Sequence, residues 1–182
     1  GTGAVAGGLK GGLGSASAVL DDGAVVAALA VVNAVGSAVD LRTGELLGAR
    51  LGLPLEFPPV AVSAAALDAL RTAAVPGPPD PGTATTLVVL ATDITLDKAG
   101  CARLAGMGHD GLARALSPVH TAMDGDTVFG LSTATRPAPE LPALVALQAA
   151  AADVVSRAVA HAMLAAETVG TWRSYPEIVA LA

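Results

Sequence analysis

The residue types that suggest chemistry begin with a threonine placed where a loop meets an apolar strand. Residues 87–91 are apolar without a break and rich in valine, which predicts a buried strand. Residues 75–82 contain four prolines and two glycines, which predicts a loop. If the bond between Ala84 and Thr85 were cut, Thr85 would carry its hydroxyl beside a free α-amine that can act as its base. The alternative is that Thr85 only begins the strand, since threonine favours strands.

A pair of carboxylates forms a second candidate. Asp124 and Asp126 flank a glycine in a tight acidic turn that leads into an apolar segment. On an extended segment, residues two apart point to the same face, so the pair could hold and polarise a hydroxyl or an amine. The alternative is an Asp-Gly turn that opens a strand. Two carboxylates are too few for a dedicated cation site.

Asn33 and Lys10 are the remaining candidates. Asn33 lies inside the apolar segment 30–35, and a buried asparagine must be hydrogen-bonded. It either satisfies the backbone at a strand end or donates an N–H to a developing oxyanion. Lys10 is the one cation among the glycine-rich residues 1–14. It is either a solvated residue at the rim or an amine that lies against a ligand.

No cofactor and no metal are expected. The glycines in residues 1–6, with Asp21 farther on, fit a dinucleotide fingerprint only loosely, because no strand precedes them. His109 and His120 are too scattered along the chain for a metal site, and no cluster of histidine and cysteine exists. We expect both histidines to be packing or hydrogen-bonding residues.

The elements that must position these residues begin with a hairpin. Two strands, 15–20 and 24–35, are joined by an Asp-Asp-Gly turn. A turn-rich segment at 37–53 follows. The next element is a helix over 64–74 with Ser63 as its cap.

The second half of the chain is predicted as strand, helix, strand and helix. Thr95 is expected to cap a helix over 96–116, with Asp97 in its first turn. Gly106, Gly108 and Gly111 weaken the middle of this helix and make two shorter helices the alternative. We expect a strand in the segment 123–133, a loop at 135–139, a long helix over 141–169 and a short terminal turn or helix. In the long helix, Asp153 and Arg157 are spaced to form an i,i+4 ion pair.

Composition limits the class of protein. The 182 residues are 53% hydrophobic, 14% charged and 2% aromatic, so one domain with a core of Ala, Val and Leu in closely packed layers is expected. The net charge of −6 argues against a nucleic-acid partner. A single cysteine excludes an internal disulfide, and no apolar run has the length of a membrane span. Without an initiator Met or a signal sequence, the chain is expected to begin inside a larger protein, with a cytoplasmic location.

Four segments together resemble the DmpA-type aminopeptidases, a family that includes β-peptidyl aminopeptidases and the nylon-oligomer hydrolase. These segments are residues 10–17, 31–36, 85–89 and 124–129. The resemblance covers nearly the whole chain. It implies an α/β fold of the αββα sandwich type, with two central sheets covered by helices. Residues 1–182 would form a single N-terminal-nucleophile hydrolase domain, cut into residues 1–84 and 85–182.

The same resemblance assigns roles to the candidate residues. The precursor would cut itself between Ala84 and Thr85, and Thr85 would be the nucleophile of an amide or peptide hydrolase. The further assignments are the oxyanion-site Asn33, the acidic pair Asp124 and Asp126, and the active-site Lys10. The lysine and the two aspartates favour the nylon-hydrolase branch. The resemblance also implies a small amide or peptide substrate, a homotetramer or larger assembly, and an active-site tyrosine farther upstream.

Two other functions remain open. Ornithine acetyltransferase resembles this fold and also cleaves itself before a threonine, so an acyltransferase of that type is one alternative. An Ala-rich, non-catalytic assembly domain is the other. Relatives with a threonine nucleophile often carry asparagine before it, whereas Ala84 occupies that place here. Thr86 is the alternative nucleophile.

Overall fold

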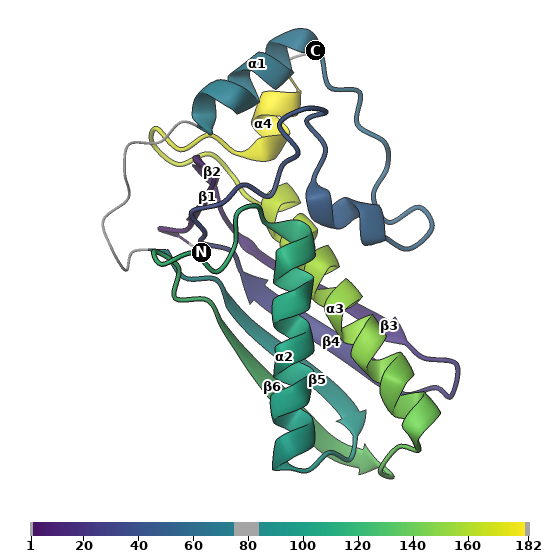
Figure 1. Ribbon diagram of the computed structural model, residues 1–182. Coiled ribbons are helices and arrows are strands. Elements are labelled where there is room, and N and C mark those ends of the chain that lie inside the picture. The colour runs from purple at the N-terminus through teal and green to yellow at the C-terminus, as the bar shows by residue number, and fades with distance from the viewer. Residues whose placement is uncertain (1, 75–83, 181–182) are drawn as a thin grey trace.

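A four-stranded sheet forms the centre of the computed structural model, which describes residues 2–74 and 84–180 (Figure 1). Its strands lie in the order β3-β4-β5-β6. The antiparallel pairs are β3 with β4 and β4 with β5, whereas β5 and β6 run parallel and are joined through helix α2. The bounds of the strands are Leu13–Val19, Val25–Val31, Leu87–Ile94 and Thr127–Arg136.

The strand register brings the candidate segments to one end of the sheet. Leu13 pairs with Val31, Val31 pairs with Leu87, and Leu87 pairs with Thr127. Each of these residues stands at an end of its strand. Four connections therefore meet at the same end of the sheet. They are the segments that lead into β3, β5 and β6 and the segment that follows β4. All five candidate side chains belong to these four connections.

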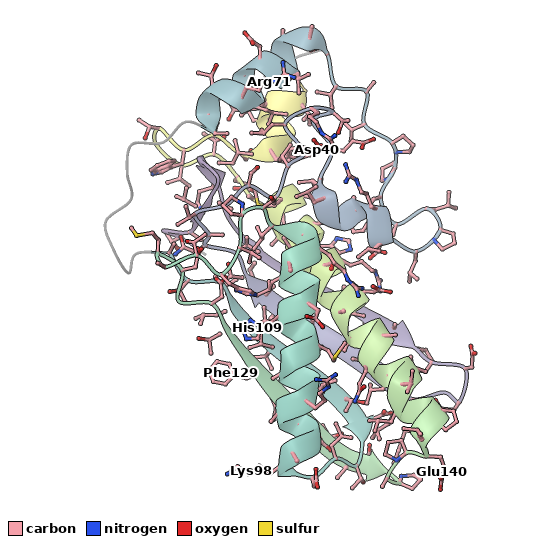
Figure 2. The ribbon with its side chains drawn as sticks, in the orientation of Figure 1. Asp40, Arg71, Lys98, His109, Phe129 and Glu140 are labelled. Carbon is pink, nitrogen blue, oxygen red and sulfur yellow. The ribbon has the colours of Figure 1, made fainter. Side chains whose placement is uncertain are left out.

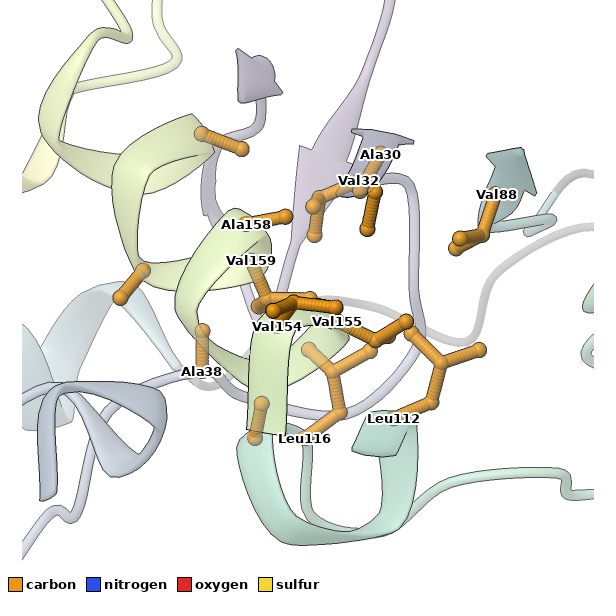
Figure 3. Packing of buried hydrophobic residues seen from close by; sticks show 14 of the residues in the cluster. Ala30, Val32, Ala38, Val88, Leu112, Leu116, Val154, Val155, Ala158 and Val159 are labelled. Atoms are coloured by element: carbon orange, nitrogen blue, oxygen red, sulfur yellow. The ribbon is translucent and has the colours of Figure 1, made fainter. Parts of the chain in front are cut away.

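Two helices cover one face of the sheet, α2 (Lys98–Ala115) and α3 (Leu141–Leu164). Figure 3 shows how short aliphatic side chains from α2 and α3 meet those of the strands in the core. The core contains alanine, valine and leucine almost throughout, as the composition predicted.

Helix α2 is continuous, so the alternative of two shorter helices is wrong. A Cβ on Gly108 would lie 2.7 Å from a methyl carbon of Val128, and one on Gly111 would lie 2.4 Å from the carbonyl oxygen of Ala152. These glycines allow α2 to pack closely on β6 and α3. Tertiary packing therefore outweighs their low helix propensity.

The other face of the sheet is open and apolar in the described part of the chain. Its exposed side chains alternate with buried ones along each strand, as expected for a sheet with one covered face. Figure 2 shows Phe129 on the side of β6 away from α2. The large apolar residues on this face are Leu13, Val19, Val25, Leu29, Leu87, Val89, Phe129 and Leu131. Such a continuous apolar surface is typical of an interface with a further layer.

The predicted fold class, an α/β layered structure with two sheets and helices, is confirmed. The second sheet in the described residues is the two-stranded pair of β1 (Val5–Ala6) and β2 (Leu9–Lys10), which lies beside the end of the large sheet where the candidate residues meet. Within residues 2–74 and 84–180, helices cover the large sheet on one face only.

The smaller elements agree with the sequence. Helix α1 (Ala64–Ala73) begins with Ser63, whose hydroxyl accepts a hydrogen bond from the Ala66 N–H. The turn-rich segment contains the 3-10 helix η1 (Leu47–Leu51), and the chain ends with the short helix α4 (Tyr175–Val179). The loop predicted at 75–82 lies outside the described residues.

Several predicted boundaries are wrong. Asp97 caps α2 by accepting a hydrogen bond from the Gly100 N–H, whereas the Thr95 hydroxyl donates to the Arg136 carbonyl on β6. Pairing between β5 and β6 also extends both strands, β5 to Ile94 and β6 to Arg136, into segments expected to be turn or loop. Helix α3 ends at Leu164, five residues earlier than the predicted 169.

The predicted ion pair between Asp153 and Arg157 does not form. Arg157 is buried and donates two hydrogen bonds to Glu56, of 2.7 and 2.9 Å, while Asp153 pairs with Arg114 at 2.6 Å. His161 also contacts Glu56 at 2.8 Å. The i,i+4 spacing on α3 does not decide the pairing, because Arg157 faces the loop that carries Glu56.

Helix α3 is, within the described residues, the one helix whose length and composition would allow it to cross a membrane. In its most apolar stretch, 56% of the residues are buried inside the protein. Packing against α2, β3 and β4 accounts for this composition.

Candidate active site

Thr85 lies two residues before the start of β5, and its hydroxyl contacts the peptide group that precedes it. The Thr85 Oγ1 donates a hydrogen bond of 2.8 Å to the carbonyl oxygen of Ala84. Thr85 is partly exposed, whereas Thr86 is fully buried. Thr86 Oγ1 has no hydrogen-bond partner in the described structure, and no solvent reaches it. Of the two adjacent threonines, only Thr85 presents a hydroxyl that a substrate could approach.

The carbonyl group of Ala84 has a second donor. The backbone N–H of Gly125 donates to the same Ala84 oxygen at 2.8 Å. A Cβ on Gly125 would lie 2.7 Å from Thr85 Oγ1, so any side chain here would compete with the hydroxyl for space. The sequence suggested only a turn role for this glycine. The one feature of the sequence that could have indicated a role in the site is the position of this glycine between two aspartates.

Asp126 holds the backbone next to Thr85. Its Oδ1 accepts a hydrogen bond of 2.8 Å from the Thr86 N–H, and its Oδ2 lies 2.8 Å from His120 Nδ1. The side chain of Asp126 is only 2% exposed. A buried carboxylate with charge-assisted hydrogen bonds fixes the peptide that it binds. Asp126 therefore determines where β5 begins.

Asp124 holds different neighbours. Its Oδ1 accepts from the Val35 N–H at 3.1 Å, and its Oδ2 accepts from Thr121, at 3.0 Å from the N–H and 2.7 Å from the hydroxyl. Both carboxylates precede β6, and neither bonds to the Thr85 hydroxyl in the described part of the chain. The acidic pair positions the backbone around the Ala84–Thr85 peptide.

Asn33 follows β4 rather than lying within it. Its Oδ1 accepts a hydrogen bond of 3.0 Å from the Val5 N–H on β1. Because the oxygen binds the backbone, the donor end of the amide is oriented by that contact. The backbone role that the sequence offered for Asn33 is observed, and the oxyanion role stays a prediction.

Lys10 is buried, with 5% of its surface exposed, so the solvated-rim alternative is wrong. Its ammonium group donates to the carbonyl oxygens of Ala4 at 3.0 Å and of Gly11 at 2.6 Å. Burial lowers the pKa of Lys10. Lys10 also fixes the segment next to Asn33, because Ala4 directly precedes Val5, the partner of Asn33.

No group of three metal-binding side chains occurs within residues 2–74 and 84–180. The two histidines nevertheless lie side by side, with His109 Nδ1 3.3 Å from His120 Nε2. The expectation that they are hydrogen-bonding residues is confirmed. The contact between the two histidines could not be predicted, because eleven residues separate them in the chain, and only His120 of the pair contacts Asp126.

Comparison with known proteins yields aminopeptidases among the relatives. The chain is 43% identical, over 189 residues, to an uncharacterized aminopeptidase of Mycobacterium leprae, covering 96% of this chain and 50% of the relative. Among solved structures, a Burkholderia sp. beta-aminopeptidase shares 26% identity with a TM-score of 0.64, covering 95% of this chain and 47% of that one.

A second solved structure is an L-aminopeptidase D-Ala-esterase/amidase from Ochrobactrum anthropi, described as a variant of the Ntn hydrolase fold. It shares 28% identity with a TM-score of 0.61, covering 93% of this chain and 44% of that one. The chain spans about half the length of the relatives that it matches. The model of peptidase family S58 matches residues 1–175. The chain therefore belongs to peptidase family S58.

Proposed function

We propose that this chain carries the catalytic centre of a self-processing amide or peptide hydrolase in which Thr85 is the N-terminal nucleophile. The observation that carries this proposal is the geometry of one peptide bond. The hydroxyl of Thr85 and the N–H of Gly125 both contact the carbonyl oxygen of Ala84, each at 2.8 Å. A nucleophile and an oxyanion donor thus meet at the bond that would be cut.

Self-cleavage would begin with attack of Thr85 Oγ on the Ala84 carbonyl carbon. The Gly125 N–H stabilises the negative oxygen, a contact worth about 3 kcal/mol in comparable sites. The C–N bond then breaks, and the hydroxyl proton passes to the nitrogen that becomes the α-amine. Water hydrolyses the resulting ester. The products are a carboxylate at Ala84 and a free hydroxyl and amine at Thr85.

The mature Thr85 would attack a substrate amide with its own α-amine as general base. Departure of Ala84 frees the Gly125 N–H for the carbonyl oxygen of the substrate. Asn33 would be the second oxyanion donor. Asp124 and Asp126 hold the nucleophile segment in place, and Lys10 adds positive charge near Asn33.

The substrate class that we propose is a small amide or a peptide. The aminopeptidase relatives support this class. Of the branches in the resemblance, the two aspartates and the lysine favour the nylon-hydrolase type. We further propose a homotetramer or larger assembly of processed units, on the basis of that resemblance.

Covalent trapping tests the proposed nucleophile. Incubation of the purified protein with an activated ester or amide should give an acyl adduct on Thr85, located by peptide mass spectrometry. Thr85→Ala should give no adduct, while hydrolysis of a chromogenic amino-acid amide falls by at least about a thousandfold. An added amine acceptor would be acylated by a transferase, and a protein without adduct or turnover would be non-catalytic. Full amidase activity in Thr85→Ala would refute the assignment.

A further inference from the structure

One loop holds both carboxylates of the candidate site. This loop runs from the end of α2 at Ala115 to the start of β6 at Thr127. Two consecutive residues within it each form a hydrogen bond with one of the aspartates. Thr121 donates to Asp124 through its N–H and hydroxyl, and His120 contacts Asp126 at 2.8 Å. A threonine and a histidine in adjacent positions thus hold the two carboxylates in place.

The backbone at His120 is unusual. Its φ of 55° lies in the left-handed region, which non-glycine residues seldom adopt. Histidine is one of the residue types that tolerate this region better than most, and such conformations gather at functional sites. The turn directs the imidazole back toward Asp126, where an extended residue would point it elsewhere.

The protonation of this contact follows from its chemistry. An ionised carboxylate only accepts hydrogen bonds, so His120 Nδ1 must carry the proton toward Asp126 Oδ2. His109 Nδ1 lies 3.3 Å from His120 Nε2, with the rings edge to face at 4.8 Å. One proton between these nitrogens satisfies both. If both imidazoles were charged, two N–H groups would face each other and the contact would break.

The charged groups around the pair act in opposite directions. Burial lowers the pKa of His109, and so does a charge on His120, while the carboxylates of Asp126 and Asp110 raise it. His109 projects from α2 toward β6 in Figure 2. His109 therefore stays neutral to lower pH than an ordinary histidine, and the hydrogen bond between the two imidazoles persists into mildly acidic solution.

We propose that His120 is a positioning residue which, supported by His109, holds Asp126 so that Asp126 fixes the Thr86 N–H and with it the Thr85 hydroxyl at the Ala84 carbonyl. The inference rests on the proposed function, because it concerns the same nucleophile. It adds a support that lies one residue farther from the reaction.

The test compares self-cleavage of the purified full chain with that of three variants from about pH 5.5 to about pH 8. His120→Ala removes the donor and should slow cleavage at least about tenfold throughout. His120→Asn keeps a short N–H donor and tolerates the left-handed backbone, so it should restore the rate to within about threefold.

The matched control is His161→Gln. His161 also bonds to a carboxylate at 2.8 Å, but that carboxylate is Glu56, beside Arg157. This variant should keep the wild-type pH profile. A His120→Ala protein with the wild-type rate and profile would overturn the proposal, and so would a failure of His120→Asn to restore the rate.

A second measurement does not require cleavage. In the Thr85→Ala protein, the amide proton of Thr86 should exchange with solvent at least about tenfold faster when His120→Ala is added, and at an unchanged rate with His120→Asn. Unchanged exchange in both variants would contradict the positioning role. Absence of cleavage in the wild type would instead contradict the proposed function, so the two failures are distinguishable.

Discussion

The hydroxyl of Thr85 lies 2.8 Å from the carbonyl oxygen of Ala84, and a Cβ at position 125 would lie only 2.7 Å from that hydroxyl. The Gly125 N–H contacts the same oxygen at 2.8 Å. This relationship places a hydroxyl, a carbonyl and a donor in one small volume. It also shows why the segment between the two aspartates must be small.

Gly125→Ala should block self-cleavage without unfolding the protein. The new Cβ would lie 2.7 Å from Thr85 Oγ1, and the hydroxyl can avoid it by rotating away from the Ala84 carbonyl. We expect a loss of about a hundredfold or more in the cleavage rate, because misplacement by about 1 Å can cost that much. Gel analysis over time would measure it.

Gly106→Ala is the matched control for that substitution. Nothing lies within 4 Å of a Cβ at Gly106 on α2, so the protein should cleave normally and gain about 0.5–1 kcal/mol of stability. Normal cleavage in Gly125→Ala would show that the Thr85 hydroxyl does not depend on this space.

Thr86→Val should show which of the two neighbouring threonines is the nucleophile. The Thr86 hydroxyl is buried and has no hydrogen-bond partner in the described structure, so replacing it with a methyl group removes an unsatisfied polar group. We expect equal or higher stability and normal cleavage. Loss of cleavage with intact folding, by circular dichroism, would assign the reaction to Thr86 instead.

Much of this arrangement follows from sequence pattern, and some of it does not. The apolar segment after Thr86 predicts β5, and Ser63 predicts the start of α1, because those signals are local. Gly108 and Gly111 argued for a break in α2, yet they lie where β6 and α3 approach the helix. Only the three-dimensional packing distinguishes a helix breaker from a site of close contact.

The site shows the same limit. The resemblance carried by four segments indicated Thr85, Asn33 and the two aspartates. The contact of His120 with Asp126 depends on a left-handed turn after α2, which a histidine in a sequence does not reveal. The partner of Arg157 was likewise missed, since Glu56 is 101 residues away in the chain.

Acid should weaken the fold through Glu56. Burial raises the pKa of Glu56, but hydrogen bonds from Arg157, the Leu53 N–H and His161 outweigh it and lower the pKa from 4.5 to about 2. A group whose pKa is lowered in the folded state stabilises the fold fully at a pH above its unfolded-state pKa. This stabilisation is lost as the pH falls through the folded-state pKa. Unfolding by urea should therefore show stability falling between about pH 4.5 and about pH 2.

Glu56→Gln should remove that part of the pH dependence and cost about 3 kcal/mol at neutral pH, because it leaves the buried Arg157 without a counter-charge. Asp153→Asn breaks the exposed pair with Arg114 and should cost less than about 1 kcal/mol. Equal effects of the two substitutions would contradict the role assigned to the buried cluster.

The intact mass of the purified wild-type chain tests the central claim most directly. The account predicts two fragments, residues 1–84 and 85–182, with threonine as the first residue of the second, and a single uncut chain for Thr85→Ala. A wild-type chain that stays uncut while it hydrolyses amides at full rate would contradict the account.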